Sequence, residues 1–158
     1  MISTKNMTHL KVKQFLPLIA LLVVYFFIRL QHLQTIPVFN DEAIYLRWSQ
    51  LIKNVDSLRF VPLSDGKEPL FMWVTAVAYK FISDPQISGR FLSVVFGSFT
   101  LVTLYIFSLI FLNYPVAVLS SIIYLFLPFT FFFDRLALPD NLLSFLGMLS
   151  LLFTFLLA

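Results

Sequence analysis

The residues in this sequence that are best suited to chemistry are carboxylic acids, and their placement says more than their number. None of the eight acidic residues lies deep inside an apolar run. Six of them flank apolar segments in three groups: Asp41 and Glu42, Asp65 and Glu68, Asp134 and Asp140. Carboxylates at such positions serve as general bases or hold divalent cations. The sequence has no cysteine and two separated histidines, His9 and His32, which excludes thiol chemistry and argues against a histidine-rich metal site.

The composition indicates that the elements positioning these acids are helices in a membrane. Hydrophobic residues make up 59% of the chain and charged residues 12%, with a mean hydropathy of +0.91. A soluble domain is about half apolar and about a quarter charged, so this composition excludes one. The net charge of +3 comes from scattered basic residues, and we expect no nucleic-acid partner. We predict an all-α integral membrane protein in contact with the lipid bilayer.

Four apolar runs are long enough to be predicted as transmembrane helices. They cover residues 15–33, 91–112, 116–133 and 142–158. The first would span about 28 Å, close to the thickness of the hydrocarbon core. Pro128 predicts a kink in the third run. The chain stops inside the fourth run, so we expect a truncated N-terminal fragment that is inactive by itself.

Basic residues near the N-terminus set the predicted topology. Lys5, Lys11 and Lys13 precede the first span, and no acid does. This bias places residues 1–14 in the cytoplasm as a tail of a multi-pass plasma (inner) membrane protein. A cleaved signal peptide is the alternative, but no small-residue cleavage site follows the run. Arg29, near the end of this span, is expected to snorkel to the outer interface.

Residues 34–90 then form an extracytoplasmic loop with two helices lying at the membrane interface. Residues 41–53 have an amphipathic helical pattern. The apolar segment at 69–82 reaches only about 20 Å, which is short for a crossing. If it does not cross, Asp41 and Asp140 emerge on the same face of the membrane. If it does cross, the two acids lie on opposite faces and cannot share a site; we favour the first arrangement.

Four short motifs, in order, resemble the N-terminal part of the GT-C membrane glycosyltransferases. They are FNDEAIY, DGKEPLFMW, ISGRFLSVVFGSFTLVTLY and DRLALPDNLLSFLGML. The resemblance covers residues 10–158 and is nearest to the protein O-mannosyltransferases and aminoarabinose transferases, of the glycosyltransferase family 39 type. It implies the N-terminal portion of a GT-C type helical bundle. It also implies a sugar donor linked to a polyprenyl phosphate and transfer, with inversion, to an extracytoplasmic acceptor.

The resemblance implies roles for residues of the first outer loop. Asp41 matches the family's catalytic acid, which would serve as the general base, and Glu42 is its neighbour. Lys67, in GKEPL, matches a residue that contacts the lipid phosphate. Arg90, in SGRF, matches an arginine at the start of the next span and could also neutralise the phosphate.

The second outer loop is expected to contribute Asp140, with Arg135 close by. Asp140 matches an acid of this loop that could orient the base, bind the acceptor, or hold a divalent cation (Mg or Mn) together with Glu42. No cofactor is certain from the resemblance, because some GT-C enzymes need a metal and others do not. The sequence departs from the family's pattern at two places. Ile44 stands where some aminoarabinose transferases carry an arginine, and the turn at 112–115 lacks the usual basic residues.

Each candidate residue also has a plainer interpretation, as a charge that stabilises a helix end, anchors a span, or stays solvated in a loop. Two other functions therefore stay open: a fragment of a transporter or flippase, and a non-catalytic membrane scaffold. Transport predicts charges near the bilayer midplane, where these apolar runs hold none. The sequence leaves the sugar, the acceptor and the oligomeric state undefined.

Overall fold

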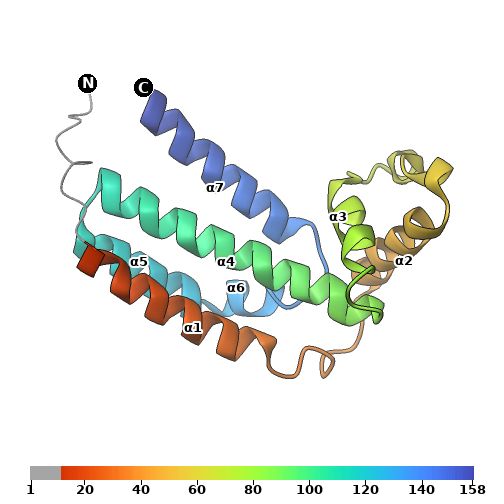
Figure 1. Cartoon of the computed structure of the whole chain (residues 1–158), viewed down its shortest axis with the longest axis horizontal. Helices are drawn as coiled ribbons and strands as arrows, with labels where there is room; N and C mark the ends of the chain where they lie inside the picture. The colour runs from red at the N-terminus through yellow and green to blue at the C-terminus, as the bar shows by residue number, and fades with distance from the viewer. Residues whose placement is uncertain (1–11) are drawn as a thin grey trace.

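A computed structural model describes residues 12–158, and within that range the chain forms helices and connecting segments without a strand (Figure 1). The long bundle consists of η2 (Val12–Phe15), α1 (Leu16–Leu30), α4 (Pro85–Phe111), α5 (Tyr114–Phe126), α6 (Pro128–Phe133) and α7 (Asp140–Leu157). A smaller unit at one end consists of α2 (Asn40–Asn54), η3 (Asp56–Leu58), η4 (Val61–Asp65) and α3 (Leu70–Ala78). Most of the expected cytoplasmic tail, 1–14, lies outside the described residues.

Three helices are long and apolar enough to cross a membrane: Val12–Leu30, Pro85–Phe111 and Asp140–Leu157. The predicted count of four spans is not confirmed, because the run at 116–133 is divided into α5 and α6. The break falls at Pro128, where the kink was predicted. Proline has no N–H to donate to the Tyr124 carbonyl, and the Thr130 hydroxyl donates to that oxygen instead, at 2.5 Å.

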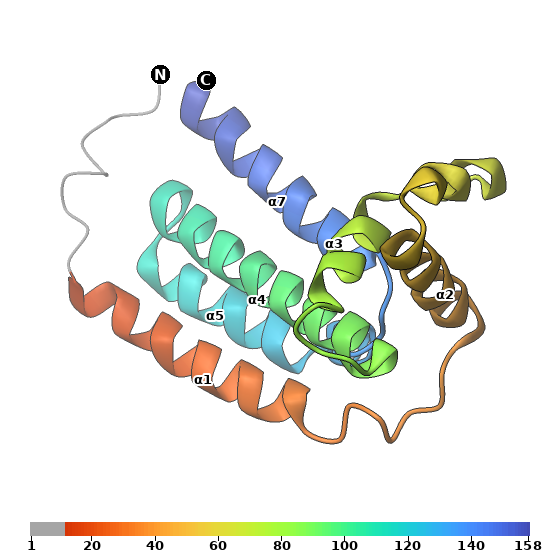
Figure 2. The ribbon, with the colours of Figure 1, turned by 45° about the vertical axis from the view of Figure 1, so that its right-hand side comes forward.

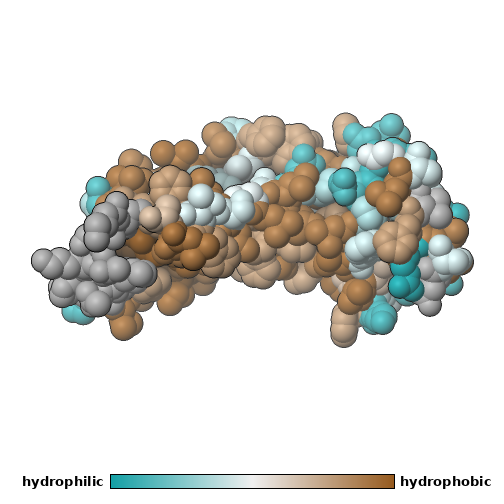
Figure 3. All heavy atoms as spheres, turned by 90° about the horizontal axis from the view of Figure 1, so that it is seen from above, coloured by the Kyte–Doolittle hydropathy of each residue, from teal (hydrophilic) through white to brown (hydrophobic). Residues whose placement is uncertain are grey.

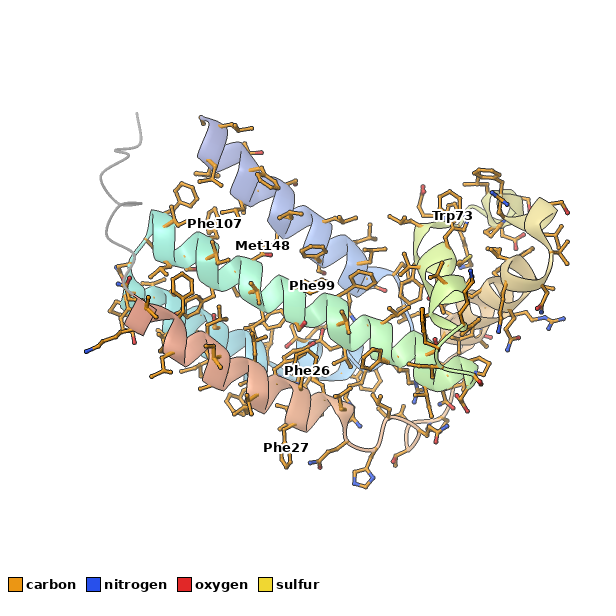
Figure 4. The ribbon with its side chains drawn as sticks, in the orientation of Figure 1. Phe26, Phe27, Trp73, Phe99, Phe107 and Met148 are labelled. Atoms are coloured by element: carbon orange, nitrogen blue, oxygen red, sulfur yellow. The ribbon has the colours of Figure 1, made fainter. Side chains whose placement is uncertain are left out.

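The helix α4 lies at the centre of the bundle, with α7 along one side and α1 and α5 along the other (Figure 1). Its apolar stretch is 56% buried, against 17% for α1 and for α7. A central cluster of buried side chains joins α1, α4 and α5: Tyr25, Val94, Leu101 and Leu125. The helix α1 has one face on this cluster and one face away from it. In Figure 4, Phe26 points toward the cluster and Phe27, which is 67% exposed, points away.

The outer surface of the bundle is apolar. Figure 3 shows brown, hydrophobic atoms along most of its length and teal, hydrophilic atoms concentrated at the end that carries α2 and α3. Large exposed side chains include Val23 at 64%, Leu119 at 58% and Phe153 at 53%. Apolar patches of this extent require a partner other than water. Together with the three long apolar helices, they indicate a helical membrane protein.

The boundaries of α4 and α5 follow from side chains that cap them. The Asp84 carboxylate accepts a hydrogen bond from the Ile87 amide at 2.8 Å, so α4 begins six residues earlier than the predicted start at 91. The Asn113 side chain accepts from the Val116 amide at 3.0 Å and begins α5 directly after the turn. These caps make the connection between α4 and α5 short and bring the two helices side by side.

The α2–α3 unit packs at the end of the bundle where α1 ends and α4 begins (Figure 2). Its own core consists of Ile52, Met72 and Ala76. A second cluster, formed by Leu46, Phe71, Ala137 and Leu142, joins it to the segment before α7. The helix α3 has nine residues and packs against α2 and the start of α4 instead of running beside the long helices.

Candidate functional site at the α2–α3 end of the bundle

Glu42 and Arg90 form a fully buried ion pair at the point where α2 meets α4. Both side chains are 0% exposed. Arg90 Nε lies 2.6 Å from Glu42 Oε1, and Arg90 Nη2 lies 2.7 Å from Glu42 Oε2, so the contact is bidentate. The same carboxylate accepts from the amides of Ala137 at 2.9 Å and Phe39 at 3.1 Å. One acid therefore joins α2, α4, the segment that precedes α2 and the segment between α6 and α7.

The remaining donors of Arg90 bind the chain that leaves α1. Nη1 donates to the carbonyls of Leu33 and Ile36, the latter at 2.9 Å, and Nη2 donates to Pro37 at 3.2 Å. Next to Arg90, Gly89 lets Ala137 and Leu46 pack closely against α4, because a Cβ there would lie 2.6 Å from both side chains. The guanidinium is thus held within the protein, and this arrangement does not present it to a lipid phosphate.

The two adjacent acids of the sequence motif have opposite environments. Glu42 is at 0% exposure while Asp41 is exposed in the first turn of α2. Glu42 fixes the start of α2, since it also accepts from the amide before the helix. Asp41 is the acid of the pair that is accessible from outside the protein.

Lys67 lies beside the same helix. Its ammonium is 5.0 Å from the centre of the Tyr45 ring, a cation–π distance. Asp41 and Tyr45 are four residues apart on α2 and therefore neighbours on its surface. Lys67 also lines a shallow groove along α2, together with Arg47, Trp48 and Asp65; we call this the α2 groove. Lys67 thus lies beside the helix whose first turn carries Asp41.

The segment between α6 and α7 places Arg135 and Asp140 at the same end of the molecule. Arg135 donates to the carbonyls of Gln31 at 2.6 Å and His32 at 3.1 Å, where α1 ends. Burial lowers the pKa of this guanidinium from its ordinary value, with the nearby Arg29 charge acting in the same direction. Asp140 is exposed in the first turn of α7, three residues after the Ala137 amide that binds Glu42.

A second buried ion pair, which the sequence did not predict, lies at the C-terminal end of α1. The Asp134 carboxylate accepts from Arg29 Nε at 3.2 Å and from the Tyr25 hydroxyl at 2.9 Å. Arg29 also donates to the Leu125 carbonyl at 2.9 Å, and its side chain is 0% exposed. The prediction that Arg29 snorkels to the interface is therefore wrong: Asp134, which follows α6, pairs with it inside the protein. Burial raises the pKa of Asp134, against the lowering effects of Tyr25 and Arg29.

One signal in the sequence could have found this pair. An arginine within an apolar span has to be neutralised by a partner if it is not at the lipid interface. Asp134 directly follows the apolar residues of the third predicted run and emerges at the end of the bundle where α1 ends.

The geometry does not fit a divalent cation between Glu42 and Asp140. Both oxygens of Glu42 are already occupied by hydrogen bonds from Arg90, Phe39 and Ala137. Over residues 12–158, histidine, aspartate and glutamate side chains do not gather in groups of three or more that could hold a metal ion. We therefore derive no step through a metal.

Comparisons with protein-family models, curated proteins and solved structures found no match to this chain.

Proposed function

We propose that this chain is the N-terminal portion of a membrane glycosyltransferase of the GT-C type, which transfers a sugar from a polyprenyl-phosphate donor to an extracytoplasmic acceptor. The four ordered sequence motifs support the proposal. The observation that supports it best is that α2 carries the exposed acid Asp41 in its first turn and has Lys67 beside it, 5.0 Å from the ring of Tyr45.

In the proposed mechanism, Asp41 accepts the proton of the acceptor hydroxyl as that oxygen attacks the anomeric carbon. The bond to the lipid phosphate breaks on the opposite face, which inverts the anomeric centre, and the carboxylate also stabilises developing positive charge on the sugar. Negative charge then accumulates on the departing phosphate. Lys67 would neutralise it from the start of the segment that enters α3.

Glu42 and Arg90 act as positioning residues in this proposal and not as groups that touch the substrate. Their bidentate contact is fully buried and holds the first turn of α2 against α4. Asp41 directly precedes Glu42, so its place at the surface depends on this anchor. Asp140, exposed at the start of α7, remains a candidate for binding the acceptor.

The transporter alternative receives little support from the distribution of charge. The charged residues within the three candidate spans are Lys13, Arg29, Arg90 and Asp140. Each lies within six residues of a span end, whereas a transport path requires charged groups near the midplane. Arg29 and Arg90, the two that are buried, are already paired with carboxylates.

The test is a transfer assay on membranes that contain the product of the gene encoding this chain, with an undecaprenyl-phosphate-linked sugar as donor. Asp41→Asn should lower the rate by about 100-fold or more, since a general base contributes about 10²–10⁴-fold. Glu68→Gln, an exposed acid of the same loop with no role in the proposal, is the control and should leave the rate unchanged. Transfer by Asp41→Asn at the control rate would overturn the assignment of the base.

Lys67 gives a second, independent variant. Lys67→Gln should slow transfer while Lys67→Arg, which keeps the charge, should retain part of it, because the proposed role is electrostatic. Equal rates for the glutamine and arginine variants would contradict a role in neutralising the phosphate.

A further inference from the structure

The α2 groove contains several side chains that the proposed transfer step does not use. Trp48 forms an aromatic wall, and Ile44 and Leu51 line the groove before and after it along α2. The other lining residues are small or polar: Asn40, Ala43, Arg47, Asp65 and Lys67. The groove has a volume of about 570 Å³, within the range of about 300–1,000 Å³ that is usual for small-molecule sites. Its size therefore suits a small organic ligand.

Trp48 is held in place by the core of the α2–α3 unit. Its side chain packs against the cluster of Ile52, Met72 and Ala76 and also lines the groove. The side chain is half-buried, so part of the indole stays open to a ligand. A rigid aromatic side chain supported in this way offers contact area at a low cost in conformational entropy.

The turn between η4 and α3 brings two charged residues to the groove. Gly66 ends η4 with a φ of 66°, a conformation that favours glycine, and its amide donates to the Leu63 carbonyl at 3.1 Å. The Lys67 amide donates to the Pro62 carbonyl at 3.2 Å. These bonds fix the turn, and Asp65 and Lys67, on either side of the glycine, both line the groove.

The charges along the groove are balanced. Arg47 and Lys67 are positive and Asp65 is negative. Asp41 adds a second negative charge, because it precedes Trp48 by seven residues, or two helical turns, and so lies on the same face of α2. Two cations and two acids leave no net charge that would select an ion. They favour a neutral ligand with many hydrogen-bonding groups.

Polar side chains are available to bind such a ligand. Within the described part of the chain, Asn40, Arg47 and Asp65 make no side-chain hydrogen bond or ion pair with another residue, and all three are exposed. Arg47 supplies only donors, Asp65 supplies only acceptors, and the amide of Asn40 supplies both. A ligand rich in hydroxyl groups matches this mixture, because each hydroxyl both donates and accepts.

A peptide or a hydrocarbon chain fits the groove less well. An extended peptide gains main-chain hydrogen bonds at the edge of a sheet, and residues 12–158 form no strand. A hydrocarbon chain would desolvate the charged rim without replacing its hydrogen bonds with water. The groove also lies on the α2–α3 unit, where hydrophilic atoms are concentrated (Figure 3).

We propose that the α2 groove binds a sugar ring, with a C–H face of the ring on the Trp48 indole and its hydroxyl groups toward Arg47 and Asp65. The C–H bonds of a pyranose carry a slight positive charge, and the face of the indole is negative. The inference rests on the proposed function for the source of the ring, which is the sugar of the donor or a saccharide acceptor. In both cases the ring lies on the face of α2 that carries Asp41, the proposed base.

Direct binding tests this proposal without a transfer reaction. The full chain would be placed in phosphatidylcholine nanodiscs, with empty nanodiscs as the blank. Binding would be measured by saturation-transfer NMR with the methyl glycosides of glucose, galactose, mannose and N-acetylglucosamine. We expect saturable binding of at least one glycoside and none of sorbitol, which has the hydroxyl groups but lacks a rigid ring.

Variants at the groove should weaken this binding. Trp48→Ala should lower the affinity about tenfold, whereas Trp73→Phe, at the other tryptophan of the chain, should leave it unchanged. Because Trp48 also packs against the core, the exposed Asp65 provides a second variant. Asp65→Asn should lower the affinity about fivefold, as expected for one lost hydrogen bond. Glu68→Gln, an exposed acid that does not line the groove, is its matched control.

Glucose 1-phosphate and mannose 1-phosphate distinguish the two sources of the ring. If the groove takes the donor sugar, the glycosyl phosphate binds more tightly than the methyl glycoside of the same sugar, and Lys67→Gln removes the difference. If the groove takes an acceptor saccharide, the two compounds bind equally. Either result supports a sugar ring and assigns its source.

Two results would overturn the proposal. The first is the absence of saturable binding by all of these sugars; binding of an acetylated, threonine-containing pentapeptide in their place would assign the groove to a peptide. The second is sugar binding that Trp48→Ala and Asp65→Asn both leave unchanged. Transfer without sugar binding in this groove would refute this inference alone, whereas sugar binding by a chain that transfers no sugar would refute the proposed function alone.

Discussion

Replacing Glu42 by Gln tests whether the buried ion pair holds the α2–α3 unit against the bundle. The glutamine keeps the shape of the side chain but removes its charge and places an amide group where an oxygen accepted hydrogen bonds from Arg90. Breaking a buried pair by neutralising one partner costs about 3–5 kcal/mol. Arg90 retains the carbonyls of Leu33, Ile36 and Pro37, so we expect the lower end, about 3 kcal/mol.

The free energy of unfolding would be measured in detergent micelles by titration with SDS, with the fluorescence of Trp48 and Trp73 as the signal. Asp41→Asn is the matched control: it removes the adjacent, exposed carboxylate and should cost less than about 1 kcal/mol. A loss below 1 kcal/mol for Glu42→Gln would refute the reasoning.

A double variant distinguishes two causes of the stability lost in Glu42→Gln: an unpaired buried charge at Arg90, and damage to the start of α2. Glu42→Gln combined with Arg90→Met leaves no unpaired charge in the interior, so it should recover part of the stability lost in Glu42→Gln alone. A double variant whose loss equals the sum of the two single losses would indicate that the charges do not interact.

Two further predictions concern packing and pH. Gly97→Ala should destabilise the chain by about 1–3 kcal/mol, because a Cβ would overlap with the Tyr25 hydroxyl and the Asp134 carboxylate. Gly147→Ala meets nothing within 4 Å and should stabilise α7 by up to about 1 kcal/mol, so equal effects in the SDS titration would contradict the described packing. Burial raises the pKa of Tyr79 above its ordinary value of 10.0. The stability contributed by its neutral phenol is therefore complete below pH 10 and is lost as the pH rises through the higher folded-state pKa. Tyr79→Phe should flatten the alkaline part of the stability curve, and an unchanged slope above pH 10 would count against this assignment.

The sequence predicted the segments of the candidate site better than the roles of individual side chains within them. The pattern at 41–53 is close to the observed α2, because amphipathic periodicity is a local property. The local sequence does not determine which side chain is buried, that of Asp41 or that of Glu42. Neighbouring helical residues point about 100° apart, and the choice depends on Arg90, 48 positions away in the sequence.

Contacts between residues that are distant in the sequence also explain the errors in the predicted spans. Arg29 was expected at the interface because a lone arginine in an apolar helix has few options, and its partner Asp134 is 105 residues distant. The break at Pro128 was predictable from the missing N–H. That it divides the run at 116–133 into two helices depends in addition on the Thr130 hydroxyl, which takes the place of the absent donor.

The short helix α6 shields the Arg29–Asp134 pair from solvent. Four of its six residues are phenylalanine, and Phe131 lies with its ring centre 4.6 Å from the Arg29 guanidinium. Phe129 and Phe133 stack behind it with ring centres 4.4 Å apart. The face of the Phe131 ring attracts the guanidinium charge, so it replaces part of the hydration that Arg29 loses on burial.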